Sequence, residues 1–224
     1  MRKVAITTDR FEDAAPWYAV RGLEPVALPC IRVVKAPEDA LRSARLAAES
    51  ADLLLITSPR TVRLLWHGRR MPPVPVAAVG EATAAAVEQA GGSVRHIGSA
   101  GLAQLAADLS RQLPLGRVVF PRAANADPAP LALVDSEGTE IVAFDVYRTV
   151  PTAPGPDPVD AVAFASPSAV EGWFLSRALD GLVVGAIGHT TAAALTGHRP
   201  VVVPDRPSHR ALAEELARSL EVNT

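Results

Sequence analysis

Residues 161–170 read AVAFASPSAV, and residues 53–62 read LLLITSPRTV. In both stretches an apolar run ends in a Ser-Pro step, after which a helical pattern begins. A short continuous apolar run is typical of a parallel strand that is covered on both faces. Serine just before a helix is a preferred N-cap. Each stretch therefore predicts a buried strand followed directly by a helix, and its occurrence twice indicates a duplicated unit.

A constant spacing relates the two halves of the chain. The shared landmarks are a Ser-Pro step, a glycine twenty-two positions later and a threonine three positions beyond the glycine. They are Ser58, Gly80 and Thr83 in the first half, and Ser166, Gly188 and Thr191 in the second. Such a repeat predicts two similar domains.

Short apolar runs alternate with helical patterns along the rest of the chain. Examples of the apolar runs are KVAITT at 3–8, VPVAAV at 74–79 and LVVGAI at 182–187. This alternation predicts an α/β fold with two doubly wound parallel sheets. Ligands of such folds generally bind at the carboxyl ends of the strands.

The composition fits a globular protein with one or two domains. The chain has 224 residues, of which 49% are hydrophobic and 21% charged, and its net charge is −2. These values exclude a disordered or coiled-coil chain, and they favour neither nucleic acid nor a membrane as partner. No window of eighteen residues is free of polar residues, so no membrane span is expected.

The single cysteine, Cys30, excludes an intramolecular disulfide and suits a reducing cytoplasm, where we expect the protein to reside. It stands in the apolar run VALPCIRVV. This position favours a buried structural thiol over a nucleophile, because reactive cysteines need exposure and nearby cations.

Hydroxyl side chains gather at the predicted strand ends and helix starts, namely Ser58, Thr83, Ser166, Thr190 and Thr191. Free backbone N–H groups and the helix dipole favour anions there. N-capping alone is an alternative for each of them. Because the set repeats in both halves, the pattern predicts capping together with the binding of carboxylates or phosphates.

Several functional motifs are absent. There is no G-x-G-x-x-G, no P-loop, no H-E-x-x-H and no G-x-S-x-G, and the five histidines are scattered. We therefore expect no nucleotide, metal or flavin cofactor. Tyr147 ends a long predicted strand, where it either packs or donates a proton to a leaving group.

The chain resembles the uroporphyrinogen-III synthase family. The matching pieces occur in the family's order between about residues 52 and 220. They include ITSPRTV, AAVGEATAAAVEQAGG, GLAQLAADL, VVFPRA, GTEIVAFDVYRTVP, AFASPSAV, AIGHTTAAAL and RALAEEL. The first fifty residues match only in type.

The resemblance implies two similar flavodoxin-like domains joined by a two-stranded β connector, with a cleft between them. Domain one would combine residues 1–33 with 152–224, and domain two would be the inserted residues 37–147. The connectors would be about 30–37 and 145–152. The angle between the domains and the oligomeric state stay open, with a monomer expected.

The resemblance also implies a reaction. The family loses water from hydroxymethylbilane, a linear tetrapyrrole with eight carboxylates, and closes it to uroporphyrinogen III with ring D inverted through a spiro intermediate. The resemblance implies a hydro-lyase that needs no cofactor and that would receive its substrate from hydroxymethylbilane synthase by transient hand-over. The alternative is a non-catalytic two-lobed regulator that binds a tetrapyrrole or another polyanion.

The resemblance assigns roles to particular residues. Tyr147 lies in the family's Val-Tyr-x-Thr motif and would assist the departure of the hydroxyl group. The positions that match the cleft lining are Ser58, Thr83, Ser166, Ser168, Thr190 and Thr191. Arg60, Arg122 and Arg148 would pair with substrate carboxylates. Arg10 and His189 stand where this chain departs from the family pattern, so their contact with substrate stays open.

Overall fold

The computed structural model describes residues 1–99, 101–198 and 200–222, and it divides into two compact units. Unit 1 comprises Met1–Val33 and Thr149–Thr224, and unit 2 comprises Val34–Arg148. No helix among the described residues has the length and apolarity needed to cross a membrane. The domain limits expected from the sequence, residues 1–33 with 152–224 and residues 37–147, remain a prediction of where independently folding domains begin and end.

Unit 1 is built on a five-stranded parallel sheet with the order β11-β10-β9-β1-β2. Its strands are β1 (Lys3–Ile6), β2 (Glu24–Ala27), β9 (Ala161–Phe164), β10 (Val183–Ala186) and β11 (Val201–Val202). Its helices are α1 (Phe11–Ala19), α6 (Pro167–Phe174), α7 (His189–Ala193) and α8 (His209–Val222). Numbered along the chain, the strands follow the flavodoxin-like order.

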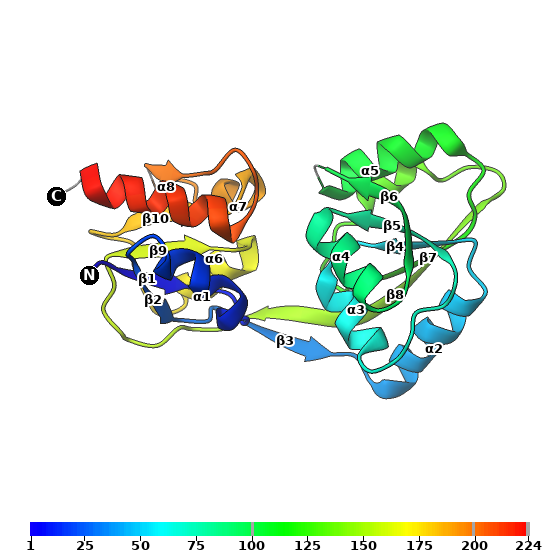
Figure 1. Ribbon diagram of the computed structural model, residues 1–224, viewed down its shortest axis with the longest axis horizontal. Coiled ribbons are helices and arrows are strands. Elements are labelled where there is room, and N and C mark those ends of the chain that lie inside the picture. The colour runs from blue at the N-terminus through cyan, green and yellow to red at the C-terminus, as the bar shows by residue number, and fades with distance from the viewer. Residues whose placement is uncertain (100, 199, 223–224) are drawn as a thin grey trace. The chain divides into compact units, whose positions relative to one another are not determined.

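Helices cover both faces of this sheet (Figure 1). Val4 and Ile6 of β1 pack with α1 and α8, which also contact each other. The intervening Ala5 belongs to the opposite core, where Val170 and Trp173 of α6 lie. Because alternate strand residues face opposite sides, a strand buried on both faces must be apolar throughout. This explains the uninterrupted run that precedes each Ser-Pro step.

Unit 2 is built on a six-stranded sheet with the order β3-β8-β7-β4-β5-β6. Its strands are β3 (Ile31–Lys35), β4 (Leu53–Ile56), β5 (Pro75–Val79), β6 (Ser93–Gly98), β7 (Gly116–Ala123) and β8 (Thr139–Pro151). Its helices are α2 (Glu38–Glu49), α3 (Pro59–Trp66), α4 (Glu81–Gln89) and α5 (Gly101–Leu109), with short 3₁₀ turns at η1 (Ser110–Gln112) and η2 (Ala129–Leu133).

The strand orders confirm the duplication that the sequence spacing predicts. The series β8-β7-β4-β5-β6 of unit 2 corresponds to β2-β1-β9-β10-β11 of unit 1. Within this five-strand series, the first strand of unit 2 along the chain is β4, the equivalent of the third strand of unit 1. The units therefore share one spatial order with different chain starts. All four residues of β4 and of β9 are buried, which is also as predicted.

Cys30 is a buried structural thiol, as the sequence predicts. Its side chain is fully buried, and the thiol donates to the carbonyl oxygen of Leu28 at 3.3 Å. Burial raises the pKa of the Cys30 thiol to about 12, while the positive charge of Arg177 opposes that rise. A thiol with so high a pKa carries almost no thiolate at neutral pH.

Gly172 allows α6 to approach the backbone of Cys30 and Thr152 closely. A Cβ at this position would come within 1.9 Å of the Cys30 carbonyl oxygen and 2.9 Å of the Thr152 carbonyl oxygen. The Thr152 N–H also donates to the Cys30 carbonyl at 2.8 Å, which restrains the Cys30 oxygen. The close contact therefore requires glycine.

We expect Gly172→Ala to lower the free energy of unfolding by about 3 kcal/mol or more, because the added methyl group forces α6 away from the backbone. Urea denaturation measures this loss. Gly155→Ala is the matched control, since its Cβ would meet only ordinary contacts at 3.4 Å and beyond. A loss no larger in Gly172→Ala than in the control would contradict the packing argument.

His209 begins α8 and packs against α1. Its Nδ1 lies 3.4 Å from the hydroxyl of Tyr18, a fully buried residue of α1. Burial lowers the pKa of the His209 imidazole below its ordinary value, and the nearby Asp13 only partly offsets this effect. The unfolded chain therefore takes up a proton at this residue more readily than the folded chain does.

Stability from the neutral His209 is fully present above the ordinary histidine pKa of about 6.5, and it is lost as the pH falls below that value. We expect His209→Gln to reduce the drop in thermal midpoint between about pH 7.5 and about pH 5.5. Differential scanning calorimetry of both proteins measures the drop, with the exposed His67→Gln as control. The same drop in His209→Gln and wild type would refute the argument.

Candidate functional site

The candidate residues of unit 2 line up along the carboxyl edge of its sheet. Tyr147 lies on β8, Arg122 near the end of β7, Ser58 two residues after β4, and Thr83 in the first turn of the helix that follows β5. These four strands are neighbours in the sheet and run parallel, so their carboxyl ends share one edge. The chain order reverses between β7 and β4, where ligands of doubly wound folds bind.

The two serines of the Ser-Pro steps are N-caps. The Ser58 Oγ accepts a hydrogen bond from the Arg60 N–H at 3.2 Å, and the Ser166 Oγ accepts one from the Ala169 N–H at 3.2 Å. The structure thus shows the capping interpretation for both. A serine hydroxyl that accepts from an N–H still has its own O–H to donate. Capping therefore leaves each serine able to bind an anion.

Tyr147 is held where the register of β8 shifts. Arg122 pairs with Asp145, whereas Ala123 pairs with Tyr147, so one extra residue of β8 lies between them. Such a bulge re-aims the side chain that follows it. Tyr147 is 7% exposed, and the guanidinium carbon of Arg60 lies 5.7 Å from the centre of its ring. Arg60 and Tyr147 are thus brought together from α3 and β8.

The other two candidate arginines differ in their surroundings. The Arg122 Nε donates to the Asp145 carboxylate at 2.9 Å, and a second nitrogen donates to the Ala126 carbonyl at 3.4 Å. Its charge is therefore largely balanced within unit 2. Arg148 is exposed and follows the buried Tyr147 on the same strand. Because successive strand residues face opposite sides, Arg148 does not share the Tyr147 side of β8.

The candidate residues of unit 1 lie at the carboxyl ends of β9 and β10. Ser166 and Ser168 are partly buried at the start of α6. In α7, Thr191 is buried, whereas Thr190 and His189 are exposed. Adjacent parallel strands again bring these two helix starts to one edge of the sheet.

Arg10, which follows β1, is engaged elsewhere. Its guanidinium pairs with the Asp13 carboxylate at 2.5 Å within the first turn of α1. A substrate carboxylate would have to compete with that partner.

Three threonines beside the candidate residues were missed in the sequence. Thr7 follows β1, is fully buried, and donates to the Ala163 carbonyl of β9 at 2.8 Å, which ties the two strands together where the chain order reverses. Thr57 follows β4 and is partly buried. Thr61 in the first turn of α3 is fully buried, and its hydroxyl has no partner among the described residues. A hydroxyl after an apolar run was the available signal for the first two.

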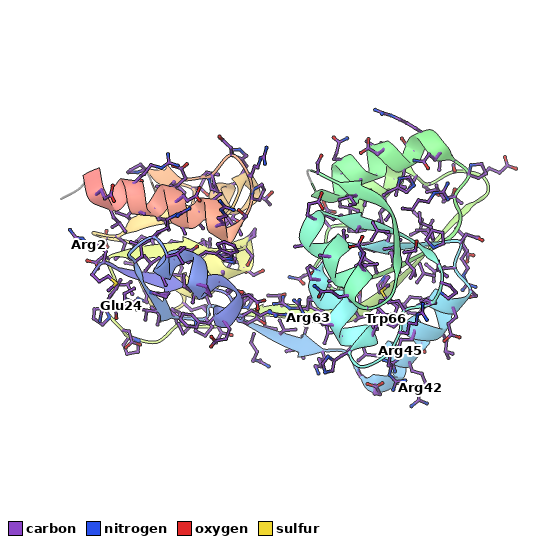
Figure 2. All side chains as sticks on the ribbon, in the orientation of Figure 1. Arg2, Glu24, Arg42, Arg45, Arg63 and Trp66 are labelled. Carbon is purple, nitrogen blue, oxygen red and sulfur yellow. The ribbon has the colours of Figure 1, made fainter. Side chains whose placement is uncertain are left out.

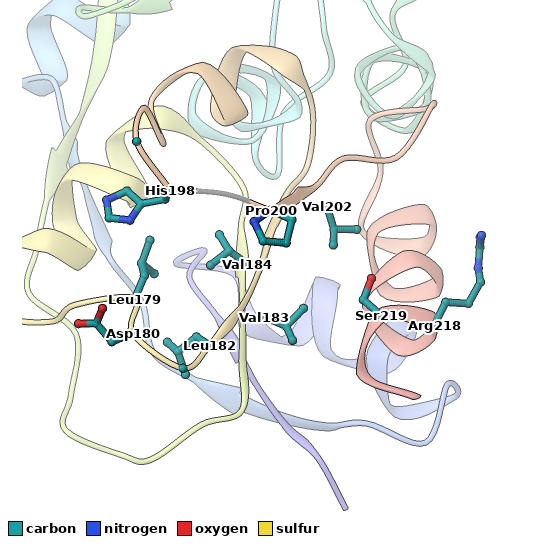
Figure 3. Close-up of a pocket in the computed structure, with 12 residues that line it drawn as sticks. Leu179, Asp180, Leu182, Val183, Val184, His198, Pro200, Val202, Arg218 and Ser219 are labelled. Atoms are coloured by element: carbon teal, nitrogen blue, oxygen red, sulfur yellow. The ribbon is translucent and has the colours of Figure 1, made fainter. Parts of the chain in front are cut away.

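A further hollow lies at the other end of the unit 1 sheet. Its volume is about 780 Å³, and Figure 3 shows it between the segments that lead into β10 and β11, with Leu182, Val184 and Pro200 along it. It therefore lies at the amino ends of these strands, away from Ser166. Among the described residues, no three His, Cys, Asp or Glu side chains are grouped so as to hold a metal ion.

Residues 15–214 match the family described as uroporphyrinogen-III synthase HemD. The chain is also 27% identical, over 246 aligned residues, to the chloroplastic uroporphyrinogen-III synthase of Oryza sativa subsp. japonica. That alignment covers 98% of this chain and 81% of the rice protein.

Two solved structures share the fold. One is a uroporphyrinogen-III synthetase from Helicobacter pylori, with a TM-score of 0.69, 18% identity, and coverage of 98% of this chain and 100% of that one. The other is a mutant uroporphyrinogen III synthase from Thermus thermophilus, with a TM-score of 0.65, 23% identity, and coverage of 99% and 100%. With the family match over most of its length, the chain belongs to the uroporphyrinogen-III synthase HemD family.

Proposed function

We propose that this protein cyclises hydroxymethylbilane to uroporphyrinogen III in tetrapyrrole biosynthesis. The observation that carries the proposal is the family match over residues 15–214, which contains every candidate residue of both sheet edges. The finer proposal is a hydro-lyase that works without a cofactor, as a monomer in the cytoplasm. We further propose that it receives its substrate by transient hand-over from hydroxymethylbilane synthase.

Substrate carboxylates are held, in this proposal, by hydroxyls and helix starts rather than by a strongly basic pocket. Ser58, Thr83, Ser166, Ser168, Thr190 and Thr191 supply O–H donors at the two sheet edges. The starts of α3, α4 and α6 add partial positive charge. Arg60 and Arg122 each supply a guanidinium, and that of Arg122 also pairs with Asp145. Arg148, on the other side of β8, has a weaker claim to substrate contact.

Tyr147 assists the first step of the proposed reaction. Its phenol donates a proton to the departing hydroxyl, so that the C–O bond breaks and water leaves. The electron pair of the pyrrole nitrogen forms the azafulvenium cation. Ring D attacks through its substituted carbon, and fragmentation and reclosure then invert it. The proton lost when the macrocycle forms restores the phenol. Arg60, whose guanidinium faces the ring, opposes the negative charge left on the tyrosine meanwhile.

The remaining contribution is positional. A flexible linear tetrapyrrole must be held in the one shape that lets ring D react at its substituted carbon, and this is an entropic cost that fixed donors remove. Two sheet edges with repeated donors suit a substrate that repeats its carboxylates on every ring.

We expect Tyr147→Phe to lower kcat by about 10²-fold with a smaller change in KM, because only the proton donor is lost. The assay generates hydroxymethylbilane in situ, oxidises the products and separates uroporphyrin isomers I and III by chromatography. Tyr18→Phe is the matched control, since Tyr18 is the other tyrosine of the chain and contacts His209.

Unchanged turnover in a folded Tyr147→Phe variant would remove the catalytic role of Tyr147 while leaving the cyclase assignment intact. If the wild-type protein yields isomer I alone, the cyclase assignment itself is overturned. Tight tetrapyrrole binding in that case would establish the non-catalytic regulator instead.

A substitution of Ser166 separates its two roles. Ser166→Ala loses the cap, so we expect a loss of about 1 kcal/mol in the free energy of unfolding. Ser166→Asp keeps a good cap, but its negative charge faces the substrate carboxylates, so KM should rise on the order of tenfold at nearly wild-type stability. Denaturation and steady-state kinetics measure both effects. An unchanged KM in Ser166→Asp would leave Ser166 as a cap alone.

A further inference from the structure

Positive charge is concentrated in one segment of unit 2. Between Leu53 and Gly80 the chain has four arginines and no aspartate or glutamate, although the net charge of the whole chain is −2. One of these arginines, Arg60, faces Tyr147. The other three line a surface beyond α3, where two arginines of α2 join them.

These side chains surround two adjoining hollows on either side of Trp66. One hollow, of about 610 Å³, has Arg42 and Arg45 of α2 in its wall. The other, of about 580 Å³, has Arg63 of α3. Trp66, Arg69 and Arg70 line both hollows. We call this two-lobed surface the arginine groove; Figure 2 shows its residues Arg42, Arg45, Arg63 and Trp66 on α2 and α3.

The arginine groove is separate from the strand-edge site. Helix α3 begins beside Ser58 at the carboxyl edge and ends at Trp66, about 12 Å further along its axis. The chain then passes the groove and enters β5 at Pro75, the amino end of that strand. The groove thus lies at the opposite end of the unit 2 sheet from the strand-edge site.

Two of the groove arginines have close neighbours within unit 2. Arg45 pairs with the Glu38 carboxylate at 2.5 Å, and its side chain is only 15% exposed. Arg70 lies over Gly91, so that a Cβ there would be 3.1 Å from its Cγ. Trp66, at 4% exposure, lines both lobes. Side chains ordered in advance lose less entropy when they bind a ligand.

Arginines outnumber acids among the residues that line the groove. Five arginines line the two lobes, whereas the acids that line them are Glu38 and Glu49. The hydrogen bond from Arg45 holds the pKa of Glu38 below its ordinary value, and the charges of Arg42 and Arg69 add to this effect. Guanidiniums of α2 and of the segment after α3 therefore both lie close enough to Glu38 to stabilise its charged form.

This arrangement defines a ligand chemistry. A guanidinium binds carboxylate and phosphate oxygens through two parallel hydrogen bonds. Each lobe has the size of a small-molecule site. Each lobe also has at least one arginine of its own, and Arg69 and Arg70 line both. We propose that the arginine groove is a second binding site, for a small organic anion that carries at least two carboxylate or phosphate groups spanning Trp66.

Titration calorimetry tests the proposal on the full chain. The probes are pyrophosphate and ATP for phosphate, and citrate for carboxylate. We expect saturable one-to-one binding of at least one probe. The double variant R42Q/R63Q removes one guanidinium from each lobe, and we expect it to weaken binding at least about tenfold. R42K/R63K keeps both positive charges but lacks the paired N–H donors of the guanidinium, so it should weaken binding less than R42Q/R63Q does.

The controls separate a built site from diffuse attraction. R95Q/R111Q removes two exposed charges of unit 2 outside the groove and should leave Kd unchanged. Ser166→Asp should also leave it unchanged, since the strand-edge site is not involved. Binding by the phosphate probes alone, or by citrate alone, supports the proposal and identifies the anion. The proposal is overturned if no probe binds saturably. It is also overturned if R95Q/R111Q weakens binding as much as R42Q/R63Q does, or if Ser166→Asp weakens binding.

Discussion

Parallel strands that are covered on both faces must all end at one edge of their sheet, and the rest of this structure depends on that constraint. The strands β4 and β9 are buried along their whole length and carry only apolar residues, so polar chemistry is excluded from these two strands. The first polar side chains appear where a strand stops and a helix starts. Ser58 and Ser166 occupy that junction in the two units and satisfy backbone N–H groups there.

The same junction serves stability and ligand binding without conflict. A serine that caps a helix uses an oxygen lone pair, whereas binding a carboxylate uses its hydrogen. The arginines of this edge follow a different principle. Arg122 is neutralised by Asp145, and Arg60 lies over the ring of Tyr147. The edge is therefore rich in donors yet only weakly basic, which suits an anionic substrate that has to leave as product.

In unit 2, the hydrogen-bond donors of the strand edge lie apart from the arginine groove. Arg60 stands at one end of α3, and the arginine groove lies beyond its other end. A modest net charge of the whole chain conceals this separation. Charges gathered around Trp66 create a local field that the total cannot reveal, because electrostatic attraction depends on distance rather than on composition.

The sequence by itself determined the fold class, the duplication and the family. Continuous apolar runs, Ser-Pro steps and one constant spacing are local signals, and the strand orders agree with them. It also placed hydroxyls at strand ends, although not Thr7 or Thr61, whose importance lies in contacts or burial. Only the tertiary structure decided that Arg60 meets Tyr147, that Arg122 is already paired with Asp145, that a bulge precedes Tyr147, and that arginines of α2 join those after α3. These relations bring together residues far apart in the chain, and side-chain periodicity carries no information about which distant residues will pack against each other.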